Sequence, residues 1–417
     1  MSTRNTVTRS HACRFCKTPL IHTFVNLGMS PLCQTHVEPE RLNEHEIFYP
    51  LHAYVCEKCF LVQVEEFASP GEIFTEYAYF SSFSDSWLEH AKKYCDMMTQ
   101  RFRIGPSHHV FEIASNDGYL LQNFVKAGVA VLGIEPAQNV AETARAKGVK
   151  TISTFLGQST ACEIVKEHGQ ADLLLGNNVL AHVPDINDFV SGMAILLRSD
   201  GLLTMEFPHL VELMENNQFD TIYHEHFSYL SFTTVEQIFA AHGMTLFDVE
   251  KLPTHGGSIR IYGQHTTSTK YAVTDRVNEM KEQEAIYGIN RLETYSDFSR
   301  KVERLKQDVL DLLIQLKRQG KKVAGYGAPG KGNTLLNYCA IRTDFLDFTV
   351  DRNPYKQGKY TPGTRIPILK PEHIRETKPD YLLILPWNLK DEIMAQTAYI
   401  REWGGKFIVP IPKVKVL

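Results

Sequence analysis

The sequence predicts an α/β protein in which a small cysteine-rich N-terminal domain precedes two Rossmann-like units. Paired cysteines stand near the start of the chain, and two later regions each alternate strand-like runs with amphipathic helical stretches. In each region a glycine-containing turn follows the first strand, as in open parallel sheets that bind nucleotides. A chain of 417 residues is too long for one core. We expect three domains, at residues 1–70, 71–255 and 256–417.

The composition is that of an ordinary globular protein, with 43% apolar residues, 22% charged residues and a formal net charge of −4. This charge gives no reason to expect nucleic acid or an anionic membrane as a partner. The polar start lacks the apolar run of a signal peptide, and no segment approaches the roughly 18 apolar residues of a membrane span. We therefore expect a cytoplasmic protein, as a monomer or a weak oligomer.

The cysteines predict a zinc site rather than a disulfide framework. Four of the eight cysteines form two C-x2-C pairs, and the others are scattered. Two such pairs supply the tetrahedral S4 set that suits Zn²⁺, although free thiols or a redox pair are the alternatives. Because four protein ligands leave no open position, a structural role is favoured over a catalytic one. The predicted ligands are Cys13, Cys16, Cys56 and Cys59.

The middle of the chain predicts a doubly wound parallel sheet with helices on both faces. An edge-like strand at residues 258–262 and a charged helical tract ending at Arg318 lead to a second α/β alternation. The predicted central strands are 110–114, 131–135, 173–176 and 202–207, the helices are 119–127, 137–147 and 187–197, and the later strands are 323–326, 348–351, 381–385 and 406–409.

The turn after the first central strand, with the sequence ASNDG, favours an adenosyl cofactor. It lies at the carboxyl end of a strand, where open sheets bind ligands, and Gly118 permits a close approach of the backbone. Glu135, at the end of the next strand, can accept hydrogen bonds from ribose hydroxyls. The missing G-x-G-x-x-G cradle suits a cofactor without phosphates better than NAD. Alternatively, the polar residues only shape a turn.

A dense reactive cluster, YHEH at residues 223–226, follows the last central strand. It is not the HExxH spacing of a metalloprotease, and its aromatic flanks favour a partly buried site over a surface cluster. Tyr223, Glu225 and His226 are suitable types for removing a proton beside a carbonyl and stabilising an enolate. His182, after the neighbouring strand, is either a further donor or a structural residue.

The C-terminal turn GYGAPGKGN, residues 325–333, fits G-x-G-x-x-G, and Asp351 ends the next strand. On pattern alone NAD is an alternative ligand. Gly332 replaces the Ser or Thr of a P-loop, which argues against an ATPase. The shared feature of these motifs is a phosphate cradle at a helix N-terminus, to which Lys331 adds charge. A turn needed only for packing is the remaining possibility.

These motifs occur in an order that resembles one known family. The two CxxC pairs, the segment YAYFSS at 77–82, ASNDG, YHEHFSYLS and the C-terminal glycine-rich unit are similar to those of the sugar C-3 methyltransferases, which act on nucleotide-linked 4-keto deoxyhexoses. The resemblance spans nearly the whole chain. It implies a zinc-binding N-terminal domain, a central class I methyltransferase domain that binds S-adenosylmethionine, and a C-terminal Rossmann-like α/β domain that binds the nucleotide sugar.

The resemblance also implies roles for individual residues. Tyr77 would be a further active-site tyrosine, and we expect His226 to be the base, with Glu225 orienting it or sharing the role, because imidazole titrates nearer neutral pH. The expected catalytic residues are His226, Glu225, Tyr223, Tyr77 and His182; the cofactor-binding residues are Ser82, Glu112, Ser115, Asn116, Asp117, Gly118, Glu135, Asn177 and Asn178; the substrate-binding residues are Lys331, Asn333, Asp351, Lys356, Trp387 and Asn388.

The expected function is therefore S-adenosylmethionine-dependent methylation of C-3 in a nucleotide-linked keto-sugar, through a general base and an enolate. An NAD-dependent nucleotide-sugar oxidoreductase and a sugar O-methyltransferase are the alternatives. The sequence does not distinguish among thymidine, guanosine and cytidine diphosphate carriers, nor does it fix the sugar's substituents.

Overall fold

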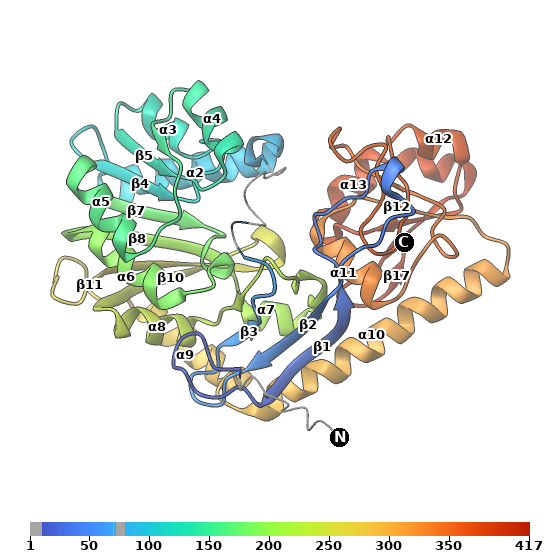
Figure 1. Ribbon diagram of the computed structural model, residues 1–417, viewed down its shortest axis with the longest axis horizontal. Helices are drawn as coiled ribbons and strands as arrows, with labels where there is room; N and C mark the ends of the chain where they lie inside the picture. The colour runs from blue at the N-terminus through green and yellow to red at the C-terminus, as the bar shows by residue number, and fades with distance from the viewer. Residues whose placement is uncertain (1–10, 70, 72–79) are drawn as a thin grey trace, which may run out of the picture.

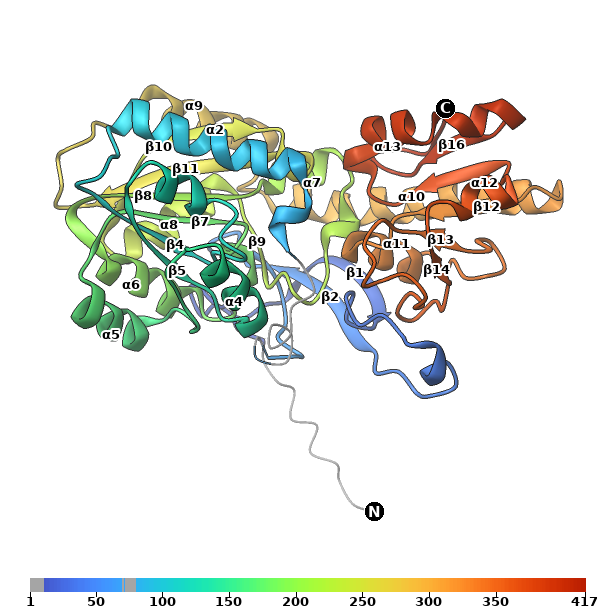
Figure 2. The same ribbon diagram turned by 90° about the horizontal axis from the view of Figure 1, so that it is seen from above.

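The computed structural model describes residues 11–69, 71 and 80–417 and arranges them around three sheets (Figure 1). The central and C-terminal α/β units lie at opposite sides of the molecule, and β1 and β2 of the N-terminal sheet lie between and below them (Figures 1 and 2). The predicted fold class is thereby confirmed. Within the described ranges, no helix is both long and apolar enough to cross a membrane.

The N-terminal sheet is antiparallel and has the order β1-β2-β3-β9. Its last strand comes from far along the chain and immediately follows the YHEH segment, so that segment is attached to the N-terminal sheet. The elements are β1 (His22–Ser30), η1 (Pro39–Arg41), β2 (Tyr49–Val55), β3 (Val62–Val64) and β9 (Ser228–Tyr229).

The central sheet has seven strands in the order β10-β11-β8-β7-β4-β5-β6. The five strands from β8 to β6 are parallel, as predicted, whereas β11 and β10 are antiparallel additions. The elements are η2 (Ser81–Phe83), α2 (Asp85–Phe102), β4 (His109–Ile113), α3 (Leu121–Lys126), β5 (Ala130–Ile134), α4 (Gln138–Ala146), β6 (Thr151–Ile152), α5 (Gln158–His168), β7 (Ala171–Asn177), η3 (Leu180–His182), α6 (Ile186–Leu196), β8 (Leu197–Pro208), α7 (Leu210–Glu215), η4 (Phe219–Thr221), α8 (Phe232–Ala241), β10 (Met244–Leu252), η5 (Thr254–Gly256) and β11 (Ser258–His265).

The prediction of an edge strand at residues 258–262 is wrong. This segment belongs to β11, which lies inside the sheet between β8 and β10. Arg260 suggests an exposed edge in the sequence, but its guanidinium is buried and paired with Glu206 and Glu250 at 2.7 and 2.8 Å. A buried charge is tolerated when it is paired and hydrogen-bonded. The central sheet thus continues to His265.

The C-terminal sheet has the order β14-β13-β12-β15-β16-β17 and is parallel except for β17. It is preceded by a long amphipathic helix, α10, whose buried residues recur every three or four positions and include Phe298, stacked on Phe24 of β1 at 4.7 Å. The elements are α9 (Asp275–Tyr287), α10 (Leu292–Arg318), β12 (Val323–Tyr326), α11 (Gly330–Tyr338), β13 (Thr349–Val350), β14 (Ile368–Leu369), α12 (His373–Thr377), β15 (Tyr381–Ile384), η6 (Trp387–Leu389), α13 (Lys390–Gln396), η7 (Ala398–Trp403), β16 (Lys406–Val409) and β17 (Lys415–Val416).

Candidate functional site

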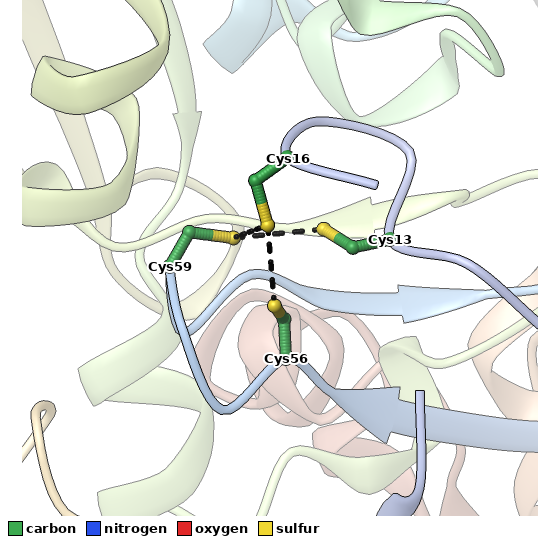
Figure 3. A group of neighbouring side chains, drawn as sticks. All are labelled: Cys13, Cys16, Cys56 and Cys59. Atoms are coloured by element: carbon green, nitrogen blue, oxygen red, sulfur yellow. Dashed lines mark hydrogen bonds between the residues drawn. The ribbon is translucent and has the colours of Figure 1, made fainter. Parts of the chain in front are cut away.

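The four predicted zinc ligands converge on one point (Figure 3). Their sulfurs lie within 4.8 Å of one another, with Cys13–Cys59 and Cys16–Cys56 at 3.5 Å and Cys16–Cys59 at 3.6 Å. Tetrahedral bonds of about 2.3 Å to Zn²⁺ separate sulfurs by roughly 3.8 Å, so the quartet accepts the ion with adjustments of a few tenths of an ångström.

The two C-x2-C pairs adopt the same turn. The amide of Lys17 donates to the Cys13 carbonyl and the amide of Phe60 donates to the Cys56 carbonyl, each at 2.9 Å, and both donor residues have left-handed φ values, 62° and 58°. The repeated turn directs the thiolates toward a shared centre. Because the four sulfurs fill a tetrahedral site, this zinc site is structural.

The loop after β4 presents polar atoms that the described residues do not satisfy. Ser115 and Asp117 are buried, yet the Ser115 hydroxyl and the Asp117 Oδ1 have no hydrogen-bond partner within the described part of the chain. Gly118 has φ +75°, and a Cβ there would meet Val149 at 2.9 Å, so the loop requires glycine. Unpartnered buried acceptors in a glycine loop suit a polar adenosyl cofactor such as S-adenosylmethionine.

Glu135 holds this loop in position. Its Oε2 accepts from the Asn116 amide and its Oε1 from the Ala137 amide, both at 2.9 Å. Burial raises the pKa of Glu135, whereas the two amides oppose that rise. Each oxygen keeps a second lone pair, so the carboxylate remains able to accept a ribose hydroxyl.

Other predicted cofactor residues surround the same loop. The Asn116 Oδ1 accepts from the Ser81 amide at 2.9 Å, and the Asn177 amide lies 3.5 Å from the Tyr119 hydroxyl. Glu112 is fully buried on β4, and burial followed by the neighbouring carboxylate of Glu135 raises its pKa well above the ordinary range. Asn178 has a left-handed φ of 55°.

Two contributors to this region were missed in the sequence. Lys147, at the end of α4, bonds Asp117 at 2.9 Å and the predicted cofactor residue Ser82 at 2.7 Å. His255 lies 3.0 Å from the Asn178 side chain, and burial, followed by the nearby Lys331, lowers its pKa to about 4. Its left-handed φ of 54°, unusual for a residue other than glycine, is the kind of backbone strain found at functional sites.

The reactive cluster forms a hydrogen-bonded chain around His226. The ring Nδ1 lies 3.0 Å from the Thr221 carbonyl, and Nε2 lies 3.1 Å from the Tyr223 hydroxyl. A carbonyl only accepts, so the proton sits on Nδ1 and the lone pair sits on Nε2. His182 stands edge-on to His226, with ring centroids 4.6 Å apart. Tyr77 lies outside the described residues.

Burial reverses the ordinary order of basicity in this cluster. Burial, followed by the neighbouring His182, lowers the pKa of His226 well below its ordinary value, and burial lowers that of His182 to about 4. Burial raises the pKa of Glu225 to about 7. The argument that imidazole is the group nearer neutrality therefore does not hold here, and Glu225 becomes a stronger candidate for the base.

The cluster lies where the three domains meet. His224 approaches the Pro50 carbonyl of β2 at 3.2 Å, and Glu225 approaches the thiol of Cys33, which follows β1, at 3.4 Å. From the C-terminal domain, the Thr334 hydroxyl of α11 donates to the Ile222 carbonyl at 3.1 Å. Sequence reasoning did not identify Cys33.

Three predicted substrate residues gather at the start of α11. The Lys331 ammonium donates to the Asn388 Oδ1 at 2.9 Å and sits 4.7 Å from the centre of the Trp387 ring. The Trp387 indole donates to Asp220 at 2.8 Å. Burial raises the pKa of Asp220 to about 7, although Lys331 opposes the shift. Asp220, just before the YHEH segment, was also missed.

Of the other three predicted substrate residues, two hold the turn before α11 and the third joins α11 to the N-terminal domain. Asp351 accepts from the Ala328 amide at 2.8 Å, and the Lys356 ammonium donates to the Ala328 carbonyl at 2.9 Å. Asn333 faces the N-terminal domain and donates to the Cys33 carbonyl at 2.7 Å. The roles of all these residues in binding and catalysis stay predictions.

A glycine loop at the carboxyl end of a parallel sheet, with acids on neighbouring strands, defines the protein as an S-adenosylmethionine-dependent methyltransferase. Family profiles match residues 13–74 as a proposed zinc-binding domain, 87–249 as a methyltransferase domain and 253–412 as a C-methyltransferase C-terminal domain. The C-methyltransferase NovU of Streptomyces niveus is 38% identical over 97% of this chain and 96% of its own length. The chain belongs to this family of zinc-containing C-methyltransferases.

More distant similarities cover only part of the chain. The ubiquinone biosynthesis O-methyltransferase of Bartonella bacilliformis is 27% identical over 22% of this chain and 38% of its own length. The structure of magnesium protoporphyrin IX methyltransferase from Synechocystis PCC 6803, with bound SAM, covers 46% of this chain and 88% of its own, at 14% identity and a TM-score of 0.33.

Proposed function

We propose that this C-methyltransferase adds a methyl group to C-3 of a nucleotide-linked 4-keto deoxyhexose. The observation that carries the proposal is the YHEH cluster, which combines an unprotonated imidazole nitrogen, a phenol and a carboxyl group of pKa about 7 in one partly buried site. These groups suit the removal of a proton beside a ketone. The adjacent turn, with Lys331 at a helix N-terminus, suits a nucleotide diphosphate.

In this proposal His226 or Glu225 takes the proton from C-3, and the C–H electrons form an enolate with the C-4 ketone. The Tyr223 hydroxyl, 3.1 Å from the His226 Nε2, would exchange a proton with the imidazole or donate to the developing enolate oxygen. His182 keeps the surroundings uncharged at neutral pH because burial lowers its pKa to about 4. Bound S-adenosylmethionine supplies the electrophilic methyl group, which C-3 takes while the sulfur retains the bonding electrons.

The nucleotide sugar would be held by the C-terminal domain. Lys331 and the α11 amides would bind the diphosphate, with Asn388 and Trp387 beside the ammonium. Asp351 and Lys356 would hold the turn, and Asn333 would tie α11 to the Cys33 backbone. Glu135, Asp117 and their neighbours would bind the cofactor, and Tyr77 would complete the catalytic set. We also propose the three domains 1–70, 71–255 and 256–417, a monomer or weak oligomer, and the cytoplasm, where the thiolates stay reduced.

Purified protein is tested with S-adenosylmethionine and a panel of 4-keto deoxyhexoses linked to thymidine, guanosine or cytidine diphosphate, in deuterated water. We expect one sugar nucleotide to gain a methyl group on carbon and the remaining substrate to exchange hydrogen at the same carbon, both seen by mass spectrometry and NMR. A methyl group on oxygen would instead establish an O-methyltransferase. Stabilisation by NAD but not by S-adenosylhomocysteine in a thermal shift would favour the oxidoreductase.

A further inference from the structure

Cys33 lies at the meeting point of the three domains. It follows β1 on the connector to β2 and is 3% exposed. Its thiol contacts the catalytic-segment residue Glu225 at 3.4 Å, across 192 positions of sequence. This is the only side-chain hydrogen bond that the Glu225 carboxyl group makes within residues 11–69, 71 and 80–417. The orientation of the carboxyl group therefore depends on a residue of the N-terminal domain.

The same cysteine contacts the turn that begins α11. Its carbonyl accepts from Asn333 at 2.7 Å, and a Cβ added to Gly330 would lie 2.9 Å from its sulfur. The glycine thus makes room for the thiol, and the Asn333 side chain fixes the backbone that carries it. Cys33 is held between the helix that bears Lys331 and the carboxyl group of Glu225.

The direction of the thiol–carboxyl contact follows from the surroundings. Burial, with the neighbouring Glu225 second, raises the pKa of Cys33 well above its ordinary value, so the sulfur keeps its proton and donates. A donor stabilises the ionised carboxylate and opposes the rise that burial causes in the pKa of Glu225. The other titratable or charged groups that act on this pair are Tyr229 from β9 and Lys356 from the segment after β13, whereas His182 from η3 contacts only the backbone of Glu225.

We propose that Cys33 is a positioning residue that orients Glu225 through its thiol and links that orientation to the seating of α11. Binding of a nucleotide diphosphate at α11 would therefore change the orientation of Glu225, through Asn333 and the Cys33 backbone. This proposal rests on the proposed role of Glu225 in proton removal. It differs from a purely packing role because it requires an S–H or O–H donor at position 33.

The test compares Cys33→Ala, which removes the donor, with Cys33→Ser, which keeps one. Cys339→Ser is the matched control, because Cys339 is also buried but lies at the end of α11, in the C-terminal core. We expect Cys33→Ala to lower kcat roughly tenfold at neutral pH, the usual effect of losing one hydrogen bond to a charged group. The acidic midpoint of its kcat profile should move to higher pH, because the anion loses its donor. Cys33→Ser should recover most of both losses.

Zinc content and the affinity for S-adenosylhomocysteine should stay unchanged in all three variants. A Cys33→Ala enzyme with the kcat and midpoint of the wild type overturns the proposal. So does a Cys33→Ser enzyme that is as impaired as Cys33→Ala, since a packing defect would then explain both. Should Cys33→Ala fail to fold, the midpoint of Cys33→Ser decides: a midpoint equal to that of the wild type and of Cys339→Ser supports the proposal, and an upward shift overturns it.

A second measurement separates this proposal from the proposed function. The infrared band of the Glu225 carboxyl group is identified as the one that disappears in the difference spectrum between the wild type and Glu225→Gln. Its pH midpoint is then measured without substrate in the wild type, Cys33→Ser and Cys33→Ala. An upward shift in Cys33→Ala supports the donor role even if no keto-sugar is methylated, an outcome that would reject only the proposed function. Equal midpoints in the wild type and Cys33→Ala, in an enzyme that methylates the sugar, reject the positioning role alone.

Discussion

The two Rossmann-like units use the same device to shape their first loop. In the central unit, Glu135 at the end of β5 accepts the Asn116 amide of the loop after β4 and also its own neighbour, the Ala137 amide. In the C-terminal unit, Asp351 just after β13 accepts the Ala328 amide of the turn after β12 and the Asn353 amide, at 2.8 and 2.9 Å. An acid on the second strand thus fixes the loop of the first strand in both.

The loops differ in the charge of the groups beside them. The central loop presents carboxyl and hydroxyl acceptors beside a single ammonium: Lys147 bonds one Asp117 oxygen, whereas the other Asp117 oxygen and the Ser115 hydroxyl have no partner within the described residues. The C-terminal turn presents the ammonium groups of Lys331 and Lys356. Acceptors suit a sulfonium cofactor with free hydroxyls, and cations suit a diphosphate. The comparison indicates that side chains, rather than sheet topology, separate the two proposed ligands.

The two units also differ in how their loops contact the N-terminal zinc-binding domain, and zinc removal tests that difference. Of the two loops, as far as residues 11–69, 71 and 80–417 show, only the C-terminal one bonds Cys33, through Asn333 at the start of α11. Structural zinc contributes on the order of 10 kcal/mol to the folding of small domains, so chelation should loosen the N-terminal domain first. We expect the affinity for the nucleotide sugar to fall far more than the affinity for S-adenosylhomocysteine, both measured by calorimetry. Equal losses would show that the support is shared, and restored zinc serves as the control.

Replacing His226 should greatly slow methyl transfer without weakening the binding of either ligand. For His226→Asn we expect kcat to fall by about 10²–10⁴, or roughly 3–5 kcal/mol, while both ligands still bind. His224→Asn is the matched control, since that histidine contacts the Pro50 carbonyl of the N-terminal sheet instead. Near-normal turnover in steady-state assays of His226→Asn would assign proton removal to Glu225.

The sequence alone predicted the features that depend on local spacing. The zinc quartet follows from two C-x2-C pairs, and the ASNDG loop follows from its place after a strand. It did not predict contacts between distant positions, such as Cys33 with Glu225, or Asp220 with Trp387 across 167 positions. The relative basicity of Glu225 and His226 was also inaccessible, because burial sets both pKa values and depends on the assembled domains.

The central loop is tested by Glu135→Ala. The variant loses two backbone hydrogen bonds and the proposed ribose contact, so we expect affinity for S-adenosylhomocysteine to fall by about 10–100-fold. Affinity for the nucleotide sugar should change less than twofold, since the C-terminal turn is held by its own acid. The control is Glu142→Ala, an exposed acid on the neighbouring helix α4. Unchanged cofactor affinity in calorimetry would contradict the predicted role of Glu135.

The smallest effect is expected for Lys331→Ala, which should lower the affinity for the nucleotide sugar and leave that for S-adenosylhomocysteine unchanged. Lys356 remains beside the turn, so affinity for the nucleotide sugar should fall only about tenfold. The dependence of that affinity on salt should weaken, because one cation is lost. Lys406→Ala is the control, since this exposed lysine begins β16, at the end of the parallel strands opposite the turn that follows β12. If calorimetry instead shows that Lys331→Ala weakens S-adenosylhomocysteine binding, the two loops do not divide the ligands by charge.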